Sequence, residues 1–415
     1  MQFMQARKAH SLIGQIYDPR NLARAWERVK ENKGAGGVDG VTVTRFEEKR
    51  EYYLGLLHQR LKDGSYRPRP VRRAEIDKPG STAKRALGIP TVMDRVCQQA
   101  MVQILEPIFE PTFRDESFGF RPGRSTHMAM RRIWRQLKAG NSWVVDADIA
   151  DFFGTLSHST LVDLVARRVA DGKVLRLLWQ FLEAGVLRDG QVEPTLTGVP
   201  QGGVASPLLS NVYLHVFDEK MAEAGFALTR FADDWVITCK SRRDAERALA
   251  SARAVLEGEL GLRVHPDKTR IVYVAQGFEF LGYKIKQGER RLRYREGSPD
   301  LYAYPRDRTI ERFKNRVRQI TTRRNPKKLG GLLDELNPVI RGWGNYFRRA
   351  HVRRLFHRLD GWIARRIWSW RYKRWRCRGY RKLPRSKLYG ELGLVDLLQL
   401  IPSMAGYYRQ KGYSR

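Results

Sequence analysis

The sequence predicts an α+β fold that ends in a basic helical segment, and two observations support this prediction. Between residues 66 and 283, short apolar runs of strand length alternate with amphipathic helical patterns. After about Leu301 the strand-like runs stop, and the chain becomes helical in pattern, very basic and rich in tryptophan. The 415 residues allow about two to four domains, and a hydrophobic content of 42% is ordinary for a folded protein.

The first part of the chain predicts helices, then an extended segment, then a long helix. Residues 16–61 predict two amphipathic helices around the glycine-rich turn 34–40, because apolar side chains recur there at helical spacing. Residues 68–76 predict an extended strand of the edge type, because they contain two prolines. Residues 92–109 predict a helix that ends before Pro111.

The charge of the chain is far from balanced. It contains 78 Lys and Arg against 44 Asp and Glu, a formal net charge of +34. Such self-repulsion is typical of proteins that bind a polyanion, whereas a merely solvated surface would intersperse acids among the bases. The sequence contains no apolar run of about 18 residues that could span a bilayer. Nucleic acid is therefore the expected partner, and no membrane partner is expected.

Cysteine usage and the first residues suggest a reducing compartment. Cys97, Cys239 and Cys377 are far apart, so the sequence supports neither a disulfide framework nor a cysteine-based zinc site. Residues 1–8 lack the apolar core of a signal peptide. We therefore expect a cytoplasmic protein.

Two apolar runs, residues 143–149 and 230–238, are interrupted by aspartate, and each predicts one central strand. Buried strands seldom carry Asp, because an unpaired buried carboxylate costs several kcal/mol. A divalent cation would relieve the repulsion between neighbouring carboxylates, and Mg²⁺ prefers oxygen ligands. Most Asp-Asp pairs lie in turns or caps, but the apolar neighbours Phe231 and Trp235 argue against a turn here. The pattern favours a metal site.

These segments resemble the catalytic motifs of group II intron reverse transcriptases. Residues 231–234 (Phe-Ala-Asp-Asp) are similar to the (Tyr/Phe)-x-Asp-Asp motif, and residues 148–153 are similar to the first catalytic strand. The resemblance implies that Asp148 and Asp233 bridge two Mg²⁺ ions, which Mn²⁺ could replace. It also implies that Asp234 is the third carboxylate and that the backbone of Ile149 is a further ligand. Gly154 stands where the family usually has Asp, and Phe231 replaces the usual Tyr.

Further segments match the family in the same order and imply a pocket for a dNTP. Lys78 and Arg85 would hold the triphosphate, for which an ammonium and a guanidinium are suited. Phe153 would lie beneath the sugar and clash with a 2′-hydroxyl, whereas Phe152 is better explained as a core residue. Gln201 would contact the sugar or the template strand. Lys268 would neutralise or protonate pyrophosphate, although a structural ion pair explains it equally well.

The same resemblance implies contacts with the template and the primer. Arg121 and Arg124 would either contact the template backbone or organise the fingers. Gly202 lies in the glycine-rich block 198–209, which would let the backbone approach the templating base pair. Leu281 and Gly282 lie in a segment that is similar to the primer grip, where a tight turn presses on the primer end.

The C-terminal part narrows the family further. Residues 336–347 resemble the maturase (X) segment that forms the thumb of group II intron proteins. Residues 361–376 interleave bases with aromatics, a pattern that favours nucleic acid over an amphipathic membrane helix. Cys377 is the only cysteine beyond the thumb, so the resemblance is to compact, endonuclease-lacking, group IIC-like members. The candidate RNA- or DNA-binding residues are Arg365, Arg366, Arg371, Lys373, Arg374, Trp375 and Arg376.

The resemblance implies a right-hand polymerase with fingers, palm and an α-helical thumb. The expected parts are an N-terminal extension (1–65), fingers and palm (66–290), the thumb or maturase domain (300–355) and a basic segment (356–415). The implied activity is RNA-directed DNA synthesis, combined with splicing and retrohoming of a group II intron. The implied partners are intron RNA, an RNA template, a DNA primer or target DNA, and dNTPs. Two alternatives stay open: a domesticated relative in CRISPR adaptation or phage defence, and a maturase that only assists splicing.

Overall fold

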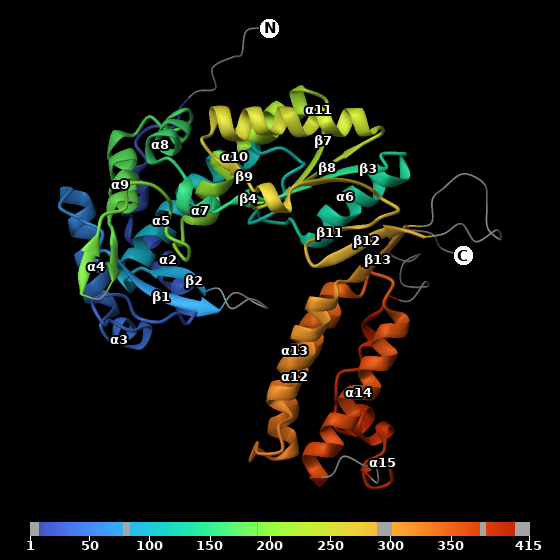
Figure 1. The fold of residues 1–415 in the computed structure, drawn as a ribbon. Helices are drawn as coiled ribbons and strands as arrows, with labels where there is room; N and C mark the ends of the chain where they lie inside the picture. Colours follow the sequence, from blue (N-terminus) through green and yellow to red (C-terminus); the bar gives the residue numbers. More distant parts are fainter. Residues whose placement is uncertain (1–7, 78–83, 189, 289–300, 374–378, 403–415) are drawn as a thin grey trace, which may run out of the picture. The chain divides into compact units, whose positions relative to one another are not determined.

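The computed structural model describes residues 8–77, 84–188, 190–288, 301–373 and 379–402 (Figure 1). The chain divides into two units, Met1–Val272 and Tyr273–Arg415. Both units contain helices and β-sheets, as the α+β prediction requires. Within the described ranges, none of the helices has the length and apolar character needed to cross a membrane.

The first unit begins with helices that pack around Trp26. Asp18 caps α2 by accepting hydrogen bonds from the backbone N–H groups of Arg20 and Asn21. Trp26 is fully buried and stacks on Phe46, with their ring centroids 4.5 Å apart. The two predicted helices correspond to α2 and α4, and two short helices are added. The four helices are α1 (Ile13–Ile16), α2 (Pro19–Glu31), α3 (Val43–Glu48) and α4 (Arg50–Asp63).

The first sheet has the strand order β2-β1-β5-β6. Strand β1 pairs antiparallel with β2 and parallel with β5, so it is an inner strand and the edge-strand prediction was wrong. Pro68 and Pro70 precede the strand, and therefore neither removes a ladder hydrogen bond. The strands are β1 (Val71–Asp77), β2 (Lys84–Ile89), β5 (Val186–Arg188) and β6 (Gln191–Glu193).

Long helices form the core of the first unit. Helix α5 has the predicted bounds, and its Thr91 cap accepts a hydrogen bond from the N–H of Asp94. The core side chains of α5, α8, α9 and α10 belong to one buried cluster. The helices from residue 92 to residue 223 are α5 (Val92–Phe109), η1 (Glu110–Thr112), α6 (Thr126–Lys138), α7 (Phe152–Thr155), α8 (His158–Ala166), α9 (Gly172–Glu183) and α10 (Ser206–Glu223).

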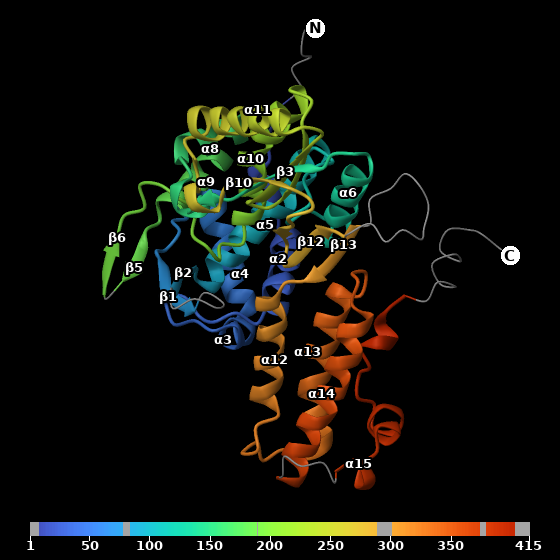
Figure 2. The same cartoon turned by 45° about the vertical axis from the view of Figure 1, so that its right-hand side comes forward.

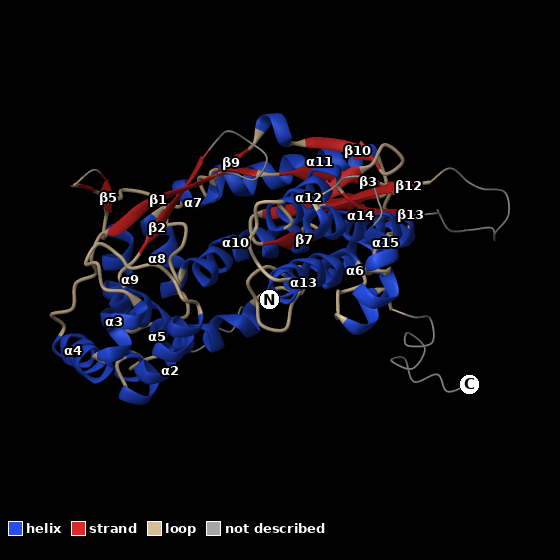
Figure 3. Ribbon diagram, turned by 90° about the horizontal axis from the view of Figure 1, so that it is seen from below, coloured by secondary structure: helices blue, strands red, loops and turns tan. Residues whose placement is uncertain are grey.

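The second sheet has the order β10-β3-β8-β7 and lies beside the pair β4-β9. Helix α11 packs on β3 and β8, and α6 and α10 pack on β7 (Figures 1 and 3). These elements are β3 (Trp143–Ala147), β4 (Ile149–Ala150), β7 (Ala227–Phe231), β8 (Asp234–Cys239), α11 (Arg242–Arg253), η2 (Ala254–Glu259), β9 (Arg263–Val264), η3 (Pro266–Lys268) and β10 (Arg270–Tyr273).

The segment 230–238 is not one strand, as predicted, but a hairpin. Strand β7 ends at Phe231, Ala232 and Asp233 form the turn, and β8 starts at Asp234. Ala232 has a φ of 59°, a left-handed conformation that reverses the chain within two residues. The apolar residues on both sides are the two strands of this hairpin, so they did not exclude a turn.

The second unit consists of a three-stranded sheet, order β11-β12-β13, and a helical bundle. Helix α12 packs on α13, and Trp343 of α13 lies against Phe356 of α14, with their ring centroids 5.8 Å apart (Figure 2). Phe313 and Trp343 stack between α12 and α13, with their centroids 4.5 Å apart. The elements are β11 (Phe278–Phe280), β12 (Tyr283–Gln287), β13 (Leu301–Pro305), α12 (Asp307–Ile320), α13 (Leu329–Phe347), α14 (Arg353–Tyr372), α15 (Gly379–Lys382), η4 (Lys387–Glu391) and η5 (Leu398–Leu400).

Candidate active site

Three aspartates lie at one end of two neighbouring strands. Strands β3 and β8 pair antiparallel, and the last pair is Ala147 with Trp235. Asp148 directly follows β3 and Asp234 is the first residue of β8, so continuing the same register places them opposite each other. Asp233 precedes Asp234 in the turn. The carboxylates therefore lie at the end of the strands and not in the buried interior that the strand prediction assumed.

A lysine from another element contacts the first of these carboxylates. Nζ of Lys268, at the end of η3, donates to Oδ2 of Asp148 at 2.5 Å. The side chain of Lys268 is 59% exposed and that of Asp148 is 25% exposed, so both can be reached by solvent. The segment is also held by its backbone, since the His265 N–H donates to the Asp148 carbonyl at 2.8 Å. The structural ion pair that sequence reasoning left open is present.

The chemistry of the donor set suits a hard cation. Asp148, Asp233 and Asp234 offer only oxygen ligands, which Mg²⁺ prefers. The cationic ammonium of Lys268 already lies against one of these carboxylates. Among the described residues, no three His, Cys, Asp or Glu side chains are arranged around one metal position. Asp146, on β3, is instead paired with Arg270 at 2.8 Å.

The block that contains Gly202 is attached to the short helix that carries Phe153. The N–H of Val199 donates to the Phe153 carbonyl at 2.7 Å. Nε2 of the buried His158 lies 2.7 Å from the Gly198 carbonyl. Gly202 has a φ of 110°, and a Cβ there would come within 2.8 Å of the Gly88 carbonyl oxygen. Gly202 therefore lies against the backbone of β2, and its predicted approach to a templating base pair stays a prediction.

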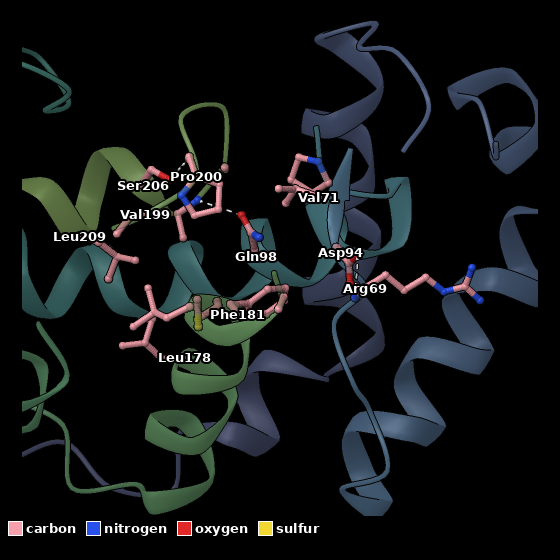
Figure 4. A pocket seen from close by; sticks show the side chains of 16 residues that line it. Arg69, Val71, Asp94, Gln98, Leu178, Phe181, Val199, Pro200, Ser206 and Leu209 are labelled. Atoms are coloured by element: carbon pink, nitrogen blue, oxygen red, sulfur yellow. Dashed lines mark hydrogen bonds between the residues drawn. The ribbon is translucent and has the colours of Figure 1, made fainter. Parts of the chain in front are cut away.

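Gln98 of α5 holds the other end of this block. Its Oε1 accepts hydrogen bonds from the N–H groups of Val204 at 2.8 Å and Ala205 at 3.3 Å. Figure 4 shows Gln98 beside Pro200 and Ser206, at a cavity of about 20 Å³. Asp94 lies at the same cavity, and burial raises the pKa of its carboxyl. Sequence reasoning missed Gln98, because a single glutamine in a helix gives no signal.

Some of the residues predicted to form the nucleotide pocket lie within the described part of the chain, and others do not. Phe152 is 2% exposed and packs in the core, as expected, whereas Phe153 is half-buried. Gln201 is half-buried, and its backbone carbonyl accepts a hydrogen bond from the N–H of Gly88 at 2.8 Å. Arg85 pairs with Ile76 across the β1–β2 ladder, but its side chain lies outside the described residues. Lys78 lies wholly outside them.

The two predicted template arginines have partners within the protein. Arg121 is buried and pairs with Glu110 at 2.8 Å, and it also donates to backbone carbonyls, among them those of Arg114 and Ser117. Arg124 pairs with Asp115 at 2.6 Å, and this hydrogen bond lowers the pKa of the Asp115 carboxyl. These contacts within the protein favour a structural role, above all for Arg121, over a contact with the template backbone.

In the second unit, Leu281 and Gly282 form the predicted tight turn between β11 and β12. Both have positive φ, 48° and 78° respectively. The hydroxyl of Tyr346 on α13 donates to the Leu281 carbonyl at 2.8 Å, so the helix bundle holds this turn. The turn is therefore fixed against the segment that resembles the maturase domain.

In the described part of the basic C-terminal segment, several basic and aromatic side chains have partners within the protein. Trp368 and Trp370 are buried and donate to the backbone carbonyls of Leu383 and Asn325, so neither can stack on bases. Arg366 is half-buried and donates to the hydroxyl of Thr321 at 3.0 Å. The exposed members of the predicted set are Arg365, Arg371 and Lys373, and those outside the described residues are Arg374, Trp375 and Arg376.

Beneath the aspartate turn lies a buried ion pair that sequence reasoning also missed. Arg230 and Asp218 are both 0% exposed in their side chains. The available signal was an arginine in an otherwise apolar run, directly before residues 231–234.

Comparison with known proteins identifies two family segments. Residues 76–285 match the reverse transcriptase (RNA-dependent DNA polymerase) family, and residues 310–389 match the maturase-specific domain of group II introns. Protein YkfC of Escherichia coli is 36% identical over 325 residues, which are 69% of this chain and 84% of YkfC. Group II intron-encoded protein LtrA of Lactococcus lactis subsp. cremoris is 31% identical over 328 residues, which are 63% of this chain.

The match covers 54% of LtrA, so the chain spans about half the length of that relative. Among solved structures, a partial Cas6-RT-Cas1--Cas2 complex is 22% identical with a TM-score of 0.38. That similarity covers 61% of this chain and 43% of the other, and it is too weak to establish a common fold.

Proposed function

The chain belongs to the family of group II intron-encoded reverse transcriptases with a maturase domain, and from this premise we propose that it copies RNA into cDNA. The proposed reaction transfers dNMP from a dNTP to the 3′-hydroxyl of a primer that is paired with an RNA template. The observation that carries this proposal is the grouping of Asp148, Asp233 and Asp234 at one end of β3 and β8.

Asp148, Asp233 and Asp234 are proposed to hold two Mg²⁺ ions, with the Ile149 backbone as a further ligand. Bound there, the ions would activate the primer hydroxyl and stabilise the leaving pyrophosphate. Mn²⁺ also accepts these oxygen ligands. Lys268 is proposed to leave Asp148 when the site is loaded and to offer its ammonium to the phosphates.

The remaining pocket is proposed to be built around the 198–205 block. Phe153 would limit space at the 2′ position of the sugar, and its backbone bond to Val199 ties it to that block. Gln201 and Gly202 would lie along the templating pair, and Lys78 and Arg85 would hold the triphosphate. In the second unit, the turn at Leu281 and Gly282 is proposed to contact the primer.

The parts of the chain are proposed to follow the right-hand arrangement of polymerases: residues 1–65 an N-terminal extension, 66–290 fingers and palm, 300–355 thumb, and 356–415 a basic binding segment. The maturase-specific match implies that intron RNA is a partner. We propose that the chain binds this RNA to assist splicing and retrohoming. The net charge of +34 supports binding of a long polyanion.

Primer extension tests this proposal. Wild-type protein with Mg²⁺ is expected to incorporate dTTP on poly(rA)/oligo(dT), and Asp233→Ala is expected to abolish incorporation. Asp163→Ala, an exposed aspartate on α8, is the matched control and should retain activity. Affinity for structured intron RNA should change by less than about tenfold in Asp233→Ala, or about 1.4 kcal/mol. Full extension by Asp233→Ala would overturn the assignment of the site.

A further inference from the structure

The buried pair beneath the aspartate turn is arranged as a fork. Nε of Arg230 donates to Oδ1 of Asp218 at 2.7 Å, and Nη2 donates to Oδ2 at 2.5 Å. Asp218 lies on α10, and Arg230 lies on β7. This planar, two-bond contact leaves no freedom for the guanidinium to rotate.

The third nitrogen of the same guanidinium reaches the turn itself. Nη1 of Arg230 donates to the backbone carbonyl of Ala232 at 2.9 Å and to Oδ1 of Asn211 at 3.0 Å. Ala232 has the left-handed φ of 59°, and its carbonyl belongs to the peptide bond that leads into Asp233. The orientation of that peptide, and therefore the start of the Asp233 side chain, is set by a fixed donor.

The other side of the turn is closed by the segment that contains Gly119. A Cβ at Gly119 would come within 2.2 Å of the Ala232 nitrogen, so only glycine allows this approach. Nδ2 of Asn211 donates to the Gly119 carbonyl at 2.9 Å. Because Asn211 also accepts from Arg230, one amide joins the guanidinium to the segment that faces the turn.

Stability alone does not explain this arrangement. A buried ion pair adds little net stability compared with apolar side chains of similar volume, because both charges lose their water. Its effect is on geometry, because a guanidinium held by two hydrogen bonds keeps its other acceptors in one orientation. Here the fixed acceptor is the carbonyl directly before Asp233 and Asp234, the carboxylates that are proposed to hold the metal ions.

We propose that Arg230 is a positioning residue for the catalytic carboxylates. Anchored by Asp218, it fixes the Ala232 carbonyl and thereby orients Asp233 and Asp234 for the metal ions. This inference rests on the proposed function of Asp148, Asp233 and Asp234. It adds a role for a residue that touches neither metal nor substrate and acts through the backbone of the turn.

Arg230→Lys is the variant that separates positioning from charge. Lysine keeps a positive charge beside Asp218, but a single ammonium cannot reproduce the fork and the bond to Ala232 together. We expect the Mg²⁺ concentration for half-maximal extension to rise at least tenfold. Binding of Mn²⁺ to the free protein, measured by electron paramagnetic resonance, should weaken by a similar factor. Primer–template affinity should stay within threefold.

Arg95→Lys is the matched control. Arg95 is also buried and donates to a backbone carbonyl, that of Ala35, but it lies on α5 and does not contact the turn. Its metal dependence should equal that of the wild type. If Arg230→Lys folds and both metal measurements equal those of the control, the proposal is overturned.

A second variant decides the matter if Arg230→Lys does not fold. Gly119→Ala leaves the ion pair intact and pushes on the turn through the Ala232 nitrogen. It should weaken Mn²⁺ binding, and unchanged binding would overturn the proposal. If the wild type fails to extend a primer while Arg230→Lys still weakens Mn²⁺ binding, the proposed polymerase function fails and the positioning role stands.

Discussion

Two adjacent phenylalanines at the start of α7 have different environments. Phe152 is 2% exposed and belongs to the main core, whereas Phe153 is only half-buried. Their ring centroids are 5.0 Å apart with the planes at 68°, so the buried ring supports the outer one. Phe153 is further fixed because its carbonyl accepts the Val199 N–H. A ring held in this way can act as a steric boundary.

Phe153→Ala should therefore relax sugar selection more than it destabilises the protein. We expect discrimination between dTTP and UTP to fall by about 10- to 100-fold, the range for a steric contact in a pocket. The measurement is kcat/KM for both nucleotides on one primer–template. Phe152→Ala is the contrasting variant, because emptying the core position costs about 3–5 kcal/mol. An unchanged nucleotide preference in Phe153→Ala would refute the steric assignment.

At the residue scale, the candidate aspartates could be picked out from the sequence, but the prediction that they lie within a continuous strand was wrong. Phe231 and Trp235 are as apolar as strand residues should be, so the run looked continuous. The reversal depends on the left-handed Ala232, a conformation that alanine does not signal. Arg230 was overlooked for a related reason, because its partner Asp218 is on another element and only the fold brings them together.

At the element scale, α14 contains a buried carboxylate. Asp360 is 6% exposed, and its Oδ1 accepts a hydrogen bond from the Leu397 N–H at 3.1 Å. Burial, followed by the nearby charge of Asp396, raises the pKa of Asp360 to about 7. Since its ordinary value is 3.8, the folded chain binds this proton more tightly than the unfolded chain does.

The sign of the pH dependence follows from this raised pKa. The stabilisation from Asp360 is fully present below pH 3.8 and is lost as the pH rises through about 7. Asp360→Asn keeps the acceptor for Leu397 and removes the titration. It should therefore stabilise the second unit at pH 8, by up to about 4 kcal/mol, and not at pH 4.

Thermal unfolding followed by tryptophan fluorescence measures this difference. Asp334→Asn, at an exposed position of α13, is the matched control. Its unfolding temperature relative to the wild type should be the same at pH 4 and at pH 8. A benefit of Asp360→Asn that is the same at both pH values would contradict the assignment.

Helices and strands whose caps and periodic patterns lie within their own segment were predicted well, whereas those that depend on distant residues were not. Helix α5 was predicted with its observed bounds, because it has a threonine cap and a long periodic pattern. Strand β1 was placed at an edge because two prolines precede it, but its pairing with β5 depends on residues more than 100 positions away. In α14, Trp368 and Trp370 belong to the segment 361–376, whose bases and aromatics predicted nucleic-acid binding, yet they donate hydrogen bonds to chain segments that follow and precede them and are buried.

At the scale of the whole molecule, the charge is the property that composition alone determined. Ion pairs within the protein cannot neutralise the net charge of +34, because 78 Lys and Arg face only 44 Asp and Glu. Each basic side chain that contacts a phosphate releases a counterion and makes binding depend on salt. Exposed bases of the second unit should therefore contribute a measurable part of the salt dependence of RNA binding.

A triple variant tests this at the exposed positions Arg365, Arg371 and Lys373, each changed to Ala. If all three contact phosphates, the slope of log K against log salt should become shallower by about 2. Filter binding of intron RNA across a salt series measures this slope, and extension on poly(rA)/oligo(dT) should continue. The matched control changes the same charge at exposed positions of the first unit: Lys62, Lys173 and Arg243. An equal loss of slope in both variants would show that the charge acts without a preferred surface, and it would remove the basic C-terminal segment from the proposed RNA interface.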